Sequence, residues 1–222
     1  MKDEITSDLV QKDVPAAVIK RLPRYHRYLG ELIKSGKERI SSAELSHMMG
    51  VTASQIRQDL NCFGGFGQQG YGYPVRYVYD KISELLGTSE GYRAVIVGAG
   101  NLGRALASTH MFERRGVTIL GLFDNKPWVV GTVIHGLSVY ASDGLTDFCK
   151  NNKVDIGVLT VPKEAAADVT KQLIAGGVRG IWNFANMELS VTEPTVTVEN
   201  IHLGDSLMNL CYQMKVNGKL PE

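Results

Sequence analysis

The sequence predicts a two-part α/β protein, in which a small helical domain precedes a doubly wound parallel sheet. Two observations support this prediction. From residue 14 to residue 86 most apolar side chains recur at helical spacing. After residue 91, short runs of Val, Ile and Leu alternate with helical segments, which is typical of a parallel sheet with helices on both faces. The stretch 87–91, Gly-Thr-Ser-Glu-Gly, separates the two patterns and is the expected domain boundary.

The composition is that of a globular protein. Its 222 residues, 44% of them hydrophobic, allow one or two domains with full cores. No apolar run approaches the roughly 18 residues of a membrane span, and the first residues do not resemble a signal peptide, so we expect a soluble cytoplasmic protein. The three cysteines are far apart, which favours free thiols over disulfides or a metal cluster. The net charge is only +1, but the basic excess is concentrated in residues 20–76.

The chain begins with a polar segment, residues 1–13, that we expect to be disordered. Pro15 then fits the first turn of a helix that extends to about Ser35 and ends at Gly36. Pro23 lies inside this pattern, so the helix is expected to kink or to split near Leu22.

Two short helices follow. Ser41 and Glu44 have the spacing of a capping box, which predicts a helix over 43–49. After a Gly-Val turn, Thr52 is the expected cap of a second helix over 53–61. This pattern predicts a helix-turn-helix, although an ordinary helical hairpin with a solvated polar face has the same pattern.

In the second of these helices Ile56 and Leu60 are expected to be buried, which leaves the polar side chains outward and able to reach bases and phosphates. The side chains expected to contact DNA from the two helices are Ser42, Ser54, Gln55, Arg57, Gln58 and Asn61.

Residues 63–75 interleave five glycines with four aromatic residues, as in a tight β-hairpin. A winged helix carries its wing at this place, and Gln69 and Tyr71 would then reach the minor groove or the backbone of DNA. A purely structural hairpin is the alternative. A helix over 78–86 is expected to complete a winged-helix domain of residues 14–87.

The second domain begins with a glycine pattern in a specific context. The predicted strand 93–97 leads into Gly98-x-Gly100-x-x-Gly103, which opens a helix. In a Rossmann-like sheet the first glycine makes the turn, the second admits a pyrophosphate, and the third lets helix and strand approach closely. Asp124 ends the next strand, 21 residues after Gly103, where an acid binds the ribose of a dinucleotide.

An acid at this position favours NADH and NAD+ over their phosphorylated forms, although Lys126 weakens that preference. A glycine turn without a ligand is the alternative. The residues expected to contact the cofactor here are Gly98, Ala99, Gly100, Asn101, Leu102, Gly103, Asp124 and Asn125.

The rest of this domain continues the alternation of strands and helices. Ligands of such sheets bind beyond the carboxyl ends of the strands, so two loops could line a nicotinamide site or could only pack against each other. These loops are Thr160, Val161 and Pro162, and Asn183, Phe184 and Ala185. The expected segments are an extended stretch 131–140, helices 142–150 and 163–175, and strands 154–160, 178–184 and 195–201.

No catalytic group stands out. The five histidines are dispersed, and none has an acid at a recognisable catalytic spacing, which favours a ligand sensor over an enzyme. The last helix, 204–215, carries an apolar stripe of Leu207, Leu210, Cys211 and Met214 that either completes its own core or docks on a second subunit.

Three stretches together resemble the Rex redox-sensing transcriptional repressors: 51–60, 63–73 and the glycine pattern 98–103. The resemblance covers about residues 14–217. It implies a homodimer with a winged-helix domain, a Rossmann NAD(H)-binding domain over 88–203, and a domain-swapped dimerisation helix and tail over 204–222. Leu203 would reach the partner subunit's cofactor.

The resemblance also implies a function. Such a protein binds double-stranded operator DNA when NADH is scarce and releases it when NADH binds, with NAD+ competing for the same site. It would have no catalytic residue, no metal and no membrane contact. An NAD-dependent dehydrogenase with an accessory helical domain is the alternative, and a structural NAD-binding scaffold is a third hypothesis.

Four positions depart from relatives. Gln58 and Gln69 stand where Lys or Arg is common, so the preferred operator is expected to differ. Thr109 stands where some relatives have Tyr, and His202 where some have Asp, while Arg27 is kept. Thr109, His202 and Arg27 would form a latch between the domains, so the chemistry of that latch is left open.

Overall fold

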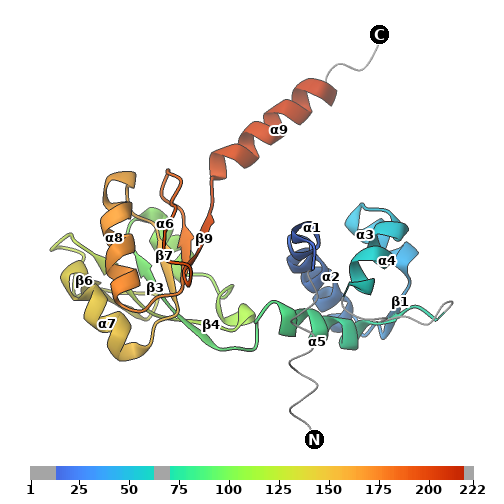
Figure 1. Cartoon of the computed structure of the whole chain (residues 1–222), viewed down its shortest axis with the longest axis horizontal. Helices are drawn as coiled ribbons and strands as arrows, with labels where there is room; N and C mark the ends of the chain where they lie inside the picture. Colours follow the sequence, from blue (N-terminus) through green and yellow to red (C-terminus); the bar gives the residue numbers. More distant parts are fainter. Residues whose placement is uncertain (1–13, 63–70, 218–222) are drawn as a thin grey trace, which may run out of the picture. The chain divides into compact units, whose positions relative to one another are not determined.

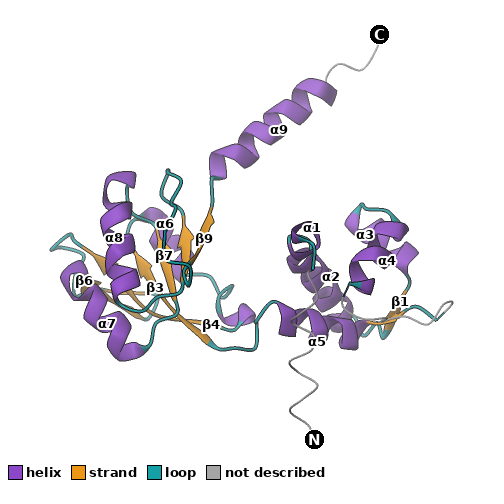
Figure 2. Ribbon diagram, viewed as in Figure 1, coloured by secondary structure: helices purple, strands orange, loops and turns teal. Residues whose placement is uncertain are grey.

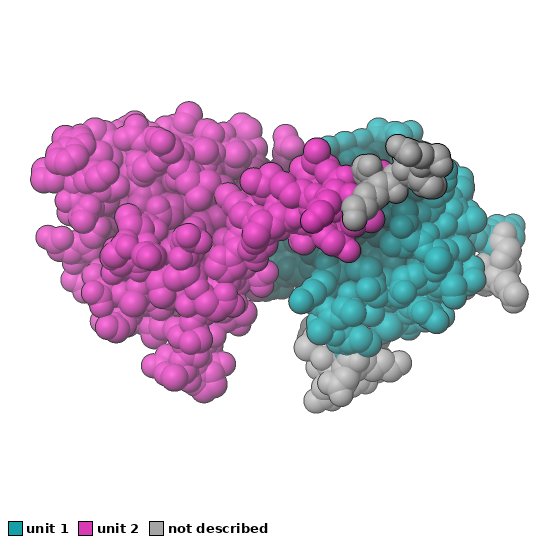
Figure 3. Space-filling view, turned by 90° about the horizontal axis from the view of Figure 1, so that it is seen from above, with its two compact units in different colours: residues 1–90 teal, residues 91–222 magenta. Residues whose placement is uncertain are grey.

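The computed structural model describes residues 14–62 and 71–217. The predictions for residues 1–13, for Gln69 and for the end of the tail therefore lie outside the described residues. The chain divides into two compact units, residues 1–90 and residues 91–222, which Figure 3 distinguishes by colour. Each unit has its own apolar core and is described by itself.

In its described residues, unit 1 is helical with one short β-ladder (Figure 1 and Figure 2). Its core contains Tyr25, Leu29, Leu45 and Ile82, none of which is exposed to solvent. The ladder is antiparallel and pairs Ile40 with Tyr73. The elements are α1 (Ala16–Ile19), α2 (Leu22–Lys34), β1 (Arg39–Ile40), α3 (Ser42–Met49), α4 (Ala53–Asn61), β2 (Tyr73–Pro74) and α5 (Val75–Leu85).

Pro23 splits the first helical pattern, as predicted. The chain leaves α1 after Ile19 and begins α2 at Leu22, so Pro23 lies in the first turn of α2, where its missing N–H removes no helical hydrogen bond. The start predicted for the last helix of this unit was three residues late. Val75 is itself a buried core residue, and Pro74 precedes it as the N-cap, so α5 begins there rather than at Val78.

Unit 2 is a seven-stranded sheet in the order β5-β6-β4-β3-β7-β8-β9. All neighbours are parallel except the β5–β6 pair at one edge. Counted in chain order, the parallel strands lie as 3-2-1-4-5-6, which is the order of a Rossmann sheet and confirms the predicted class. The strands are β3 (Tyr92–Val97), β4 (Val117–Asp124), β5 (Val133–Ile134), β6 (Leu137–Ala141), β7 (Ile156–Leu159), β8 (Gly180–Asn183) and β9 (Thr197–Asn200).

Helices cover both faces of this sheet (Figure 1). Val95 and Val97 of β3 pack in one apolar cluster with residues of α7 (Leu145–Asn152) and α8 (Lys163–Ala175). Ile96, between them, points into the cluster on the other face, against which α6 (Asn101–Ala107) packs. This alternation explains why β3 is apolar along its length.

Two predicted segments differ from the structure. The extended stretch 131–140 is a hairpin, in which β5 and β6 are joined by His135 and Gly136, both at positive φ. The helix predicted over 142–150 begins with a 3₁₀ turn, Ser142–Gly144, and its α-helical part is α7. In contrast, α8 has the predicted bounds, because Pro162 and Gly176 flank it.

The last helix, α9 (Leu203–Asn217), has no buried residue. Leu207, Leu210 and Met214 are 61%, 52% and 65% exposed, so the apolar stripe does not complete the core of its own unit. Docking of this stripe on a second subunit stays a prediction.

Candidate functional site

The loop after β3 is shaped by glycines for separate steric reasons. Gly98 has φ +105, a conformation that L side chains rarely adopt, and a Cβ there would lie 2.6 Å from the carbonyl oxygen of Thr160. Its N–H donates to the carbonyl oxygen of Phe123 at 2.8 Å. The Thr160 hydroxyl donates to the Gly98 carbonyl oxygen at 2.8 Å. The turn is therefore tied to two neighbouring strands and requires glycine.

Gly103 and Gly100 are glycines for opposite reasons. A Cβ on Gly103 would lie 1.9 Å from the Gly98 carbonyl oxygen, so any side chain there would push α6 off the loop. A Cβ on Gly100 would meet nothing within 4 Å, and its φ of −75° suits any residue. The protein itself does not require glycine at position 100. The open space beside it is what the close approach of a pyrophosphate requires.

The residues around this space agree with that use. Gly100 is the N-cap of α6 and supplies no side-chain cap, so the first N–H groups of the helix keep their capacity for an acceptor. Asn101 is exposed, Leu102 is half-buried and Ala99 is buried. The arrangement fits the phosphates of a dinucleotide.

Asp124 lies at the carboxyl end of β4, as predicted, and is 9% exposed. One carboxylate oxygen accepts from the N–H of Ala99 at 2.8 Å, and the other accepts from the N–H of Lys126 at 2.9 Å. The carboxylate thus positions the glycine loop. Each oxygen has a further lone pair, so binding of a ribose hydroxyl by Asp124 stays a prediction. Asn125 and Lys126, which follow it, are exposed.

The two loops predicted to line the nicotinamide site differ from each other. In the first, Thr160 is half-buried and engaged with the glycine turn, Val161 is half-buried, and Pro162 is exposed at the N-cap of α8. In the second, Phe184 is half-buried, and its ring meets the ring of Trp182 edge-on at 4.6 Å.

Asn183 does not fit its predicted place in that wall. Its side chain is fully buried, and its amide nitrogen donates to the carbonyl oxygen of Met187 and to the side-chain oxygen of Asn200. Its own oxygen accepts from the N–H of Ala185, which is also buried. The amide of Asn183 holds the loop together from inside and has no free donor for a ligand.

In unit 1 the helix-turn-helix has its predicted caps. Ser41 and Glu44 make both hydrogen bonds of a capping box at the start of α3, and Gly50 ends that helix in the left-handed conformation. The Thr52 hydroxyl accepts from the N–H of Gln55 at 3.1 Å and caps α4. These local contacts fix the turn between the two helices.

Most of the side chains predicted to contact DNA are outward. Ser54, Gln58 and Asn61 are exposed on α4. Arg57 is exposed as well, and its guanidinium donates to the hydroxyl of Ser42 at 3.2 Å. This hydrogen bond brings a residue of α3 and a residue of α4 to one polar surface.

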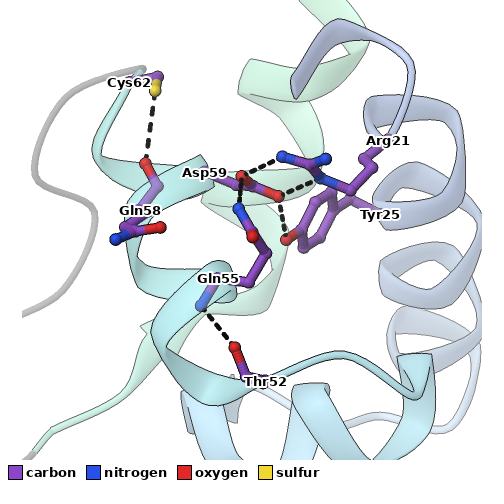
Figure 4. Close-up of polar contacts among 7 residues, drawn as sticks. All are labelled: Arg21, Tyr25, Thr52, Gln55, Gln58, Asp59 and Cys62. Atoms are coloured by element: carbon purple, nitrogen blue, oxygen red, sulfur yellow. Dashed lines mark hydrogen bonds and ion pairs between the residues drawn. The ribbon is translucent and has the colours of Figure 1, made fainter. Parts of the chain in front are cut away.

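Gln55 is the exception. It is half-buried, and its amide nitrogen donates to a carboxylate oxygen of Asp59 at 2.8 Å (Figure 4). Asp59 is only 1% exposed and was missed as a functional candidate in the sequence. Its position could have identified it, because it lies three residues after Ile56 and beside Leu60 on the buried side of the helix.

Only the end of the predicted wing lies among the described residues, and there β2 pairs with β1. Residues 63–70, Gln69 among them, lie outside the described residues. Tyr71 is 72% exposed, and the guanidinium of Arg39 lies over its ring, 5.4 Å from the centroid. The same guanidinium donates to the carbonyl oxygen of Tyr71 at 2.8 Å. Tyr71 is therefore held at the surface beside a positive charge.

The three positions of the predicted latch have separate local contacts. The Thr109 hydroxyl donates to the carbonyl oxygen of Leu106 at 2.9 Å. His202 lies 2.9 Å from a carboxylate oxygen of Glu188 in the same unit. Arg27 is exposed, with its guanidinium 5.3 Å from the ring centroid of Tyr28.

Two features are absent from the described part of the chain. No three His, Cys, Asp or Glu side chains among residues 14–62 and 71–217 are grouped as metal ligands. No helix in the same ranges is both long enough and apolar enough to cross a membrane.

Comparison with known proteins adds the family. A model of the N-terminus of a putative DNA-binding protein matches residues 13–61, and a model of a CoA binding domain matches residues 89–187. The redox-sensing transcriptional repressor Rex of Clostridium botulinum (strain Alaska E43 / Type E3) is 51% identical over 203 residues, which are 91% of this chain and 96% of that protein. The repressor of the same name from Clostridioides difficile (strain 630) is 50% identical over 93% of this chain and 98% of that protein.

Solved structures agree with these relatives. The structure of RSP, described as a Rex-family repressor, in complex with β-NAD+ and operator DNA has a TM-score of 0.85 and 47% identity, and covers 94% of this chain and 99% of RSP. RSP in complex with β-NADH has a TM-score of 0.84 and 44% identity over 94% of this chain and 97% of RSP. With the Rossmann strand order, the glycine loop and the capped helix-turn-helix in one chain, these identities show that the protein belongs to the Rex family of redox-sensing transcriptional repressors.

Proposed function

We propose that this protein binds operator DNA as a homodimer when NADH is scarce and leaves the DNA when NADH binds. The observation that carries the proposal is the presence of two sites in one chain. One is the open space at Gly100, which a pyrophosphate can fill. The other is the exposed polar face of α4, with Ser54, Arg57 and Gln58. A dehydrogenase would need the first site but would have no use for the second.

The DNA end of the proposal rests on α4 and the wing. A recognition helix places such side chains in the major groove, where amide groups pair with adenine and guanidinium groups with guanine or phosphate. Tyr71, with Gln69, would follow the adjacent minor groove. Because a repressor acts where the DNA is, the cytoplasmic location expected from the sequence follows from this function.

The cofactor end must distinguish two redox states. NADH and NAD+ share the pyrophosphate and riboses, so the contacts of Gly100 and Asp124 hold both. The difference is the positive charge on the oxidised nicotinamide, which is costly to place in an apolar environment. We propose that this apolar environment consists of Val161 and Phe184 of one subunit and Leu203 of the partner subunit. The edge-on packing of the Phe184 ring against the ring of Trp182 supports this assignment.

The proposed homodimer rests on α9. Its Leu207, Leu210 and Met214 are more than half exposed, an apolar surface that is unfavourable in water and suited to a second copy. Exchange of α9 would carry Leu203 to the neighbouring cofactor. A change in how the two subunits pack would then alter the spacing of the two recognition helices, which must match half-sites roughly 34 to 36 Å apart.

The test begins with selection. The full-length protein is incubated with duplexes randomised over about two helical turns, roughly 20 base pairs, and the bound fraction is sequenced. The selected duplex is then used in anisotropy titrations at fixed salt, because phosphate contacts make affinity salt-dependent. We expect a palindromic sequence, release by NADH, and little release by NAD+. No selected sequence, or oxidation of NADH with aldehydes, would overturn the proposal in favour of a dehydrogenase.

A further inference from the structure

The only carboxylate on α4 is buried under a set of side chains that come from a different helix. Asp59 accepts two hydrogen bonds from the guanidinium of Arg21, both 2.7 Å long, and one from the hydroxyl of Tyr25 at 2.8 Å. Its fourth hydrogen bond comes from the amide of Gln55 on its own helix. Figure 4 shows Asp59 between these three side chains.

The spacing of these residues makes the set a joint between two helices. Arg21, the N-cap of α2, is one turn before Tyr25, and Gln55 is one turn before Asp59 on α4. The side chains of each pair therefore lie on one side of their helix. Asp59 is where the two pairs meet, so the recognition helix is tied to α2 by a polar contact as well as by Ile56 and Leu60 in the core.

The charge of Asp59 is compensated within this set. Burial alone would raise the pKa of its carboxyl, but hydrogen bonds from Arg21, Tyr25 and Gln55 outweigh burial and lower the pKa. Asp59 is consequently ionised at neutral pH and can only accept hydrogen bonds. An uncompensated carboxylate on a helix that approaches DNA would repel phosphates, and Arg21 removes that repulsion.

An ionised acceptor also determines which way the amide of Gln55 points. Because Asp59 cannot donate, the group that faces it must be the amide nitrogen and not the oxygen. Within the described part of the chain the amide oxygen of Gln55 accepts no hydrogen bond, so this oxygen and the second N–H of the amide stay free for a ligand. An acceptor beside a donor is the pair that adenine binds in the major groove.

We propose that Arg21 and Asp59 are positioning residues for base recognition, which hold the Gln55 amide in one orientation and thereby set the preference for adenine at one position of each half-site. The proposal rests on the proposed DNA-binding function and adds to it a residue outside the helix-turn-helix. Gln55 would touch the base, whereas Arg21 and Asp59 would act only through Gln55.

The test compares Asp59→Asn with Gln55→Ala and with the double variant. The asparagine of Asp59→Asn would keep the shape of the aspartate, but it can donate as well as accept, so the amide of Gln55 could turn either way. The selection from randomised duplexes is repeated for each variant, and dissociation constants are measured for the selected duplex and its single-base changes. We expect the wild type to prefer adenine at one position by on the order of tenfold, the size of one bidentate contact.

Asp59→Asn should remove most of that preference, and adding Asp59→Asn to Gln55→Ala should change the preference no further. A purely structural role predicts a different result, in which affinity falls equally for all duplexes while the preference is kept. That result would overturn the proposal. If the wild type selects no sequence at all, the proposed DNA-binding function fails as well. This outcome differs from a wild type that selects a sequence and an Asp59→Asn variant that keeps the same preference, so failure of the function and failure of the positioning proposal are distinguishable.

Two controls complete the design. Asp80→Asn removes a carboxylate from the exposed pair with Arg76 on α5, and should raise affinity for every duplex without altering the base preference. Arg21→Lys keeps the charge but loses the two-pronged contact, so it should weaken the preference by an intermediate factor even if Asp59→Asn folds poorly. An unchanged base preference in Arg21→Lys, with retained DNA binding as evidence that unit 1 is folded, would also overturn the proposal.

Discussion

The glycine loop of unit 2 and the recognition helix of unit 1 are held in place by different means. The loop is fixed by backbone sterics, since Gly98 and Gly103 leave no room for a Cβ. The helix is fixed by side chains, since Asp59 connects α4 to Arg21 and Tyr25. A site held by backbone tolerates no substitution at its close contacts, whereas a site held by a side-chain set can lose one member and keep its fold.

The largest effect is expected for Gly103→Ala. Its Cβ would lie 1.9 Å from the carbonyl oxygen of Gly98, a backbone atom that cannot move without the whole turn. We expect a loss of stability on the order of 3 kcal/mol, the upper range for overpacking, together with loss of NADH binding. Thermal unfolding and NADH titration measure both, and a normal melting temperature would show that the helix can shift at little cost.

Gly100→Val tests the same loop from the opposite side. A Cβ here meets nothing within 4 Å, so unit 2 should fold normally while NADH affinity falls by roughly a hundredfold or more, because the side chain would occupy the pyrophosphate position. Operator binding should persist and no longer respond to NADH. Unchanged NADH affinity would remove this loop from the cofactor site.

Asp59→Ala breaks the corresponding contact in unit 1. It leaves the guanidinium of Arg21 and the hydroxyl of Tyr25 without their acceptor. Because the Arg21 side chain is 29% exposed, the loss in free energy of unfolding should lie between the values for surface and buried ion pairs, at about 2 kcal/mol. Denaturant unfolding should show the loss in unit 1, with NADH affinity unchanged. A change in NADH affinity would contradict the separation of the two sites.

Asp124→Asn should have a smaller effect. The amide oxygen of the new asparagine can still accept from the N–H of Ala99, so the loop should survive, but the amide nitrogen cannot accept from the N–H of Lys126, and the negative charge is lost. We expect NADH affinity to fall by about fivefold and the preference over NADPH to narrow. Titration with both cofactors measures the ratio, and an unaltered ratio would refute the assignment of Asp124 to the ribose.

The smallest effect is a pH dependence of unit 1. In the folded protein the pKa of Asp59 lies below its ordinary value of 3.8. The ionised carboxylate therefore stabilises the folded state above pH 3.8, and this stabilisation is lost as the pH falls through the folded-state pKa. The melting temperature of the wild type minus that of Asp59→Asn should be constant above about pH 5 and shrink below about pH 4. A difference that stays constant to about pH 3 would contradict the ion pair.

Much of the fold follows from local patterns. The capping box at Ser41, the break at Pro23 and the bounds of α8 were predicted correctly, because each depends on residues within a few positions of one another. The hairpin of β5 and β6 and the early start of α5 were not. The hairpin pairs residues only three and five positions apart, but its turn places His135, which is not a glycine, at positive φ. The start of α5 depends on the burial of Val75 in the core of unit 1. Composition and periodicity specify neither.

The candidate sites divide in the same way. The sequence by itself determined the glycine loop and the acid at the end of β4, because the need for glycine is a property of the backbone at that residue and the spacing of a βαβ unit is fixed. Only the tertiary structure decided that the buried amide of Asn183 is hydrogen-bonded to Asn200 and that the amide nitrogen of Gln55 donates to Asp59. It also decided that Asp59 is paired with Arg21, 38 residues away. A polar side chain can face water or a distant partner with the same local sequence, and which it does is set by what the fold packs against it.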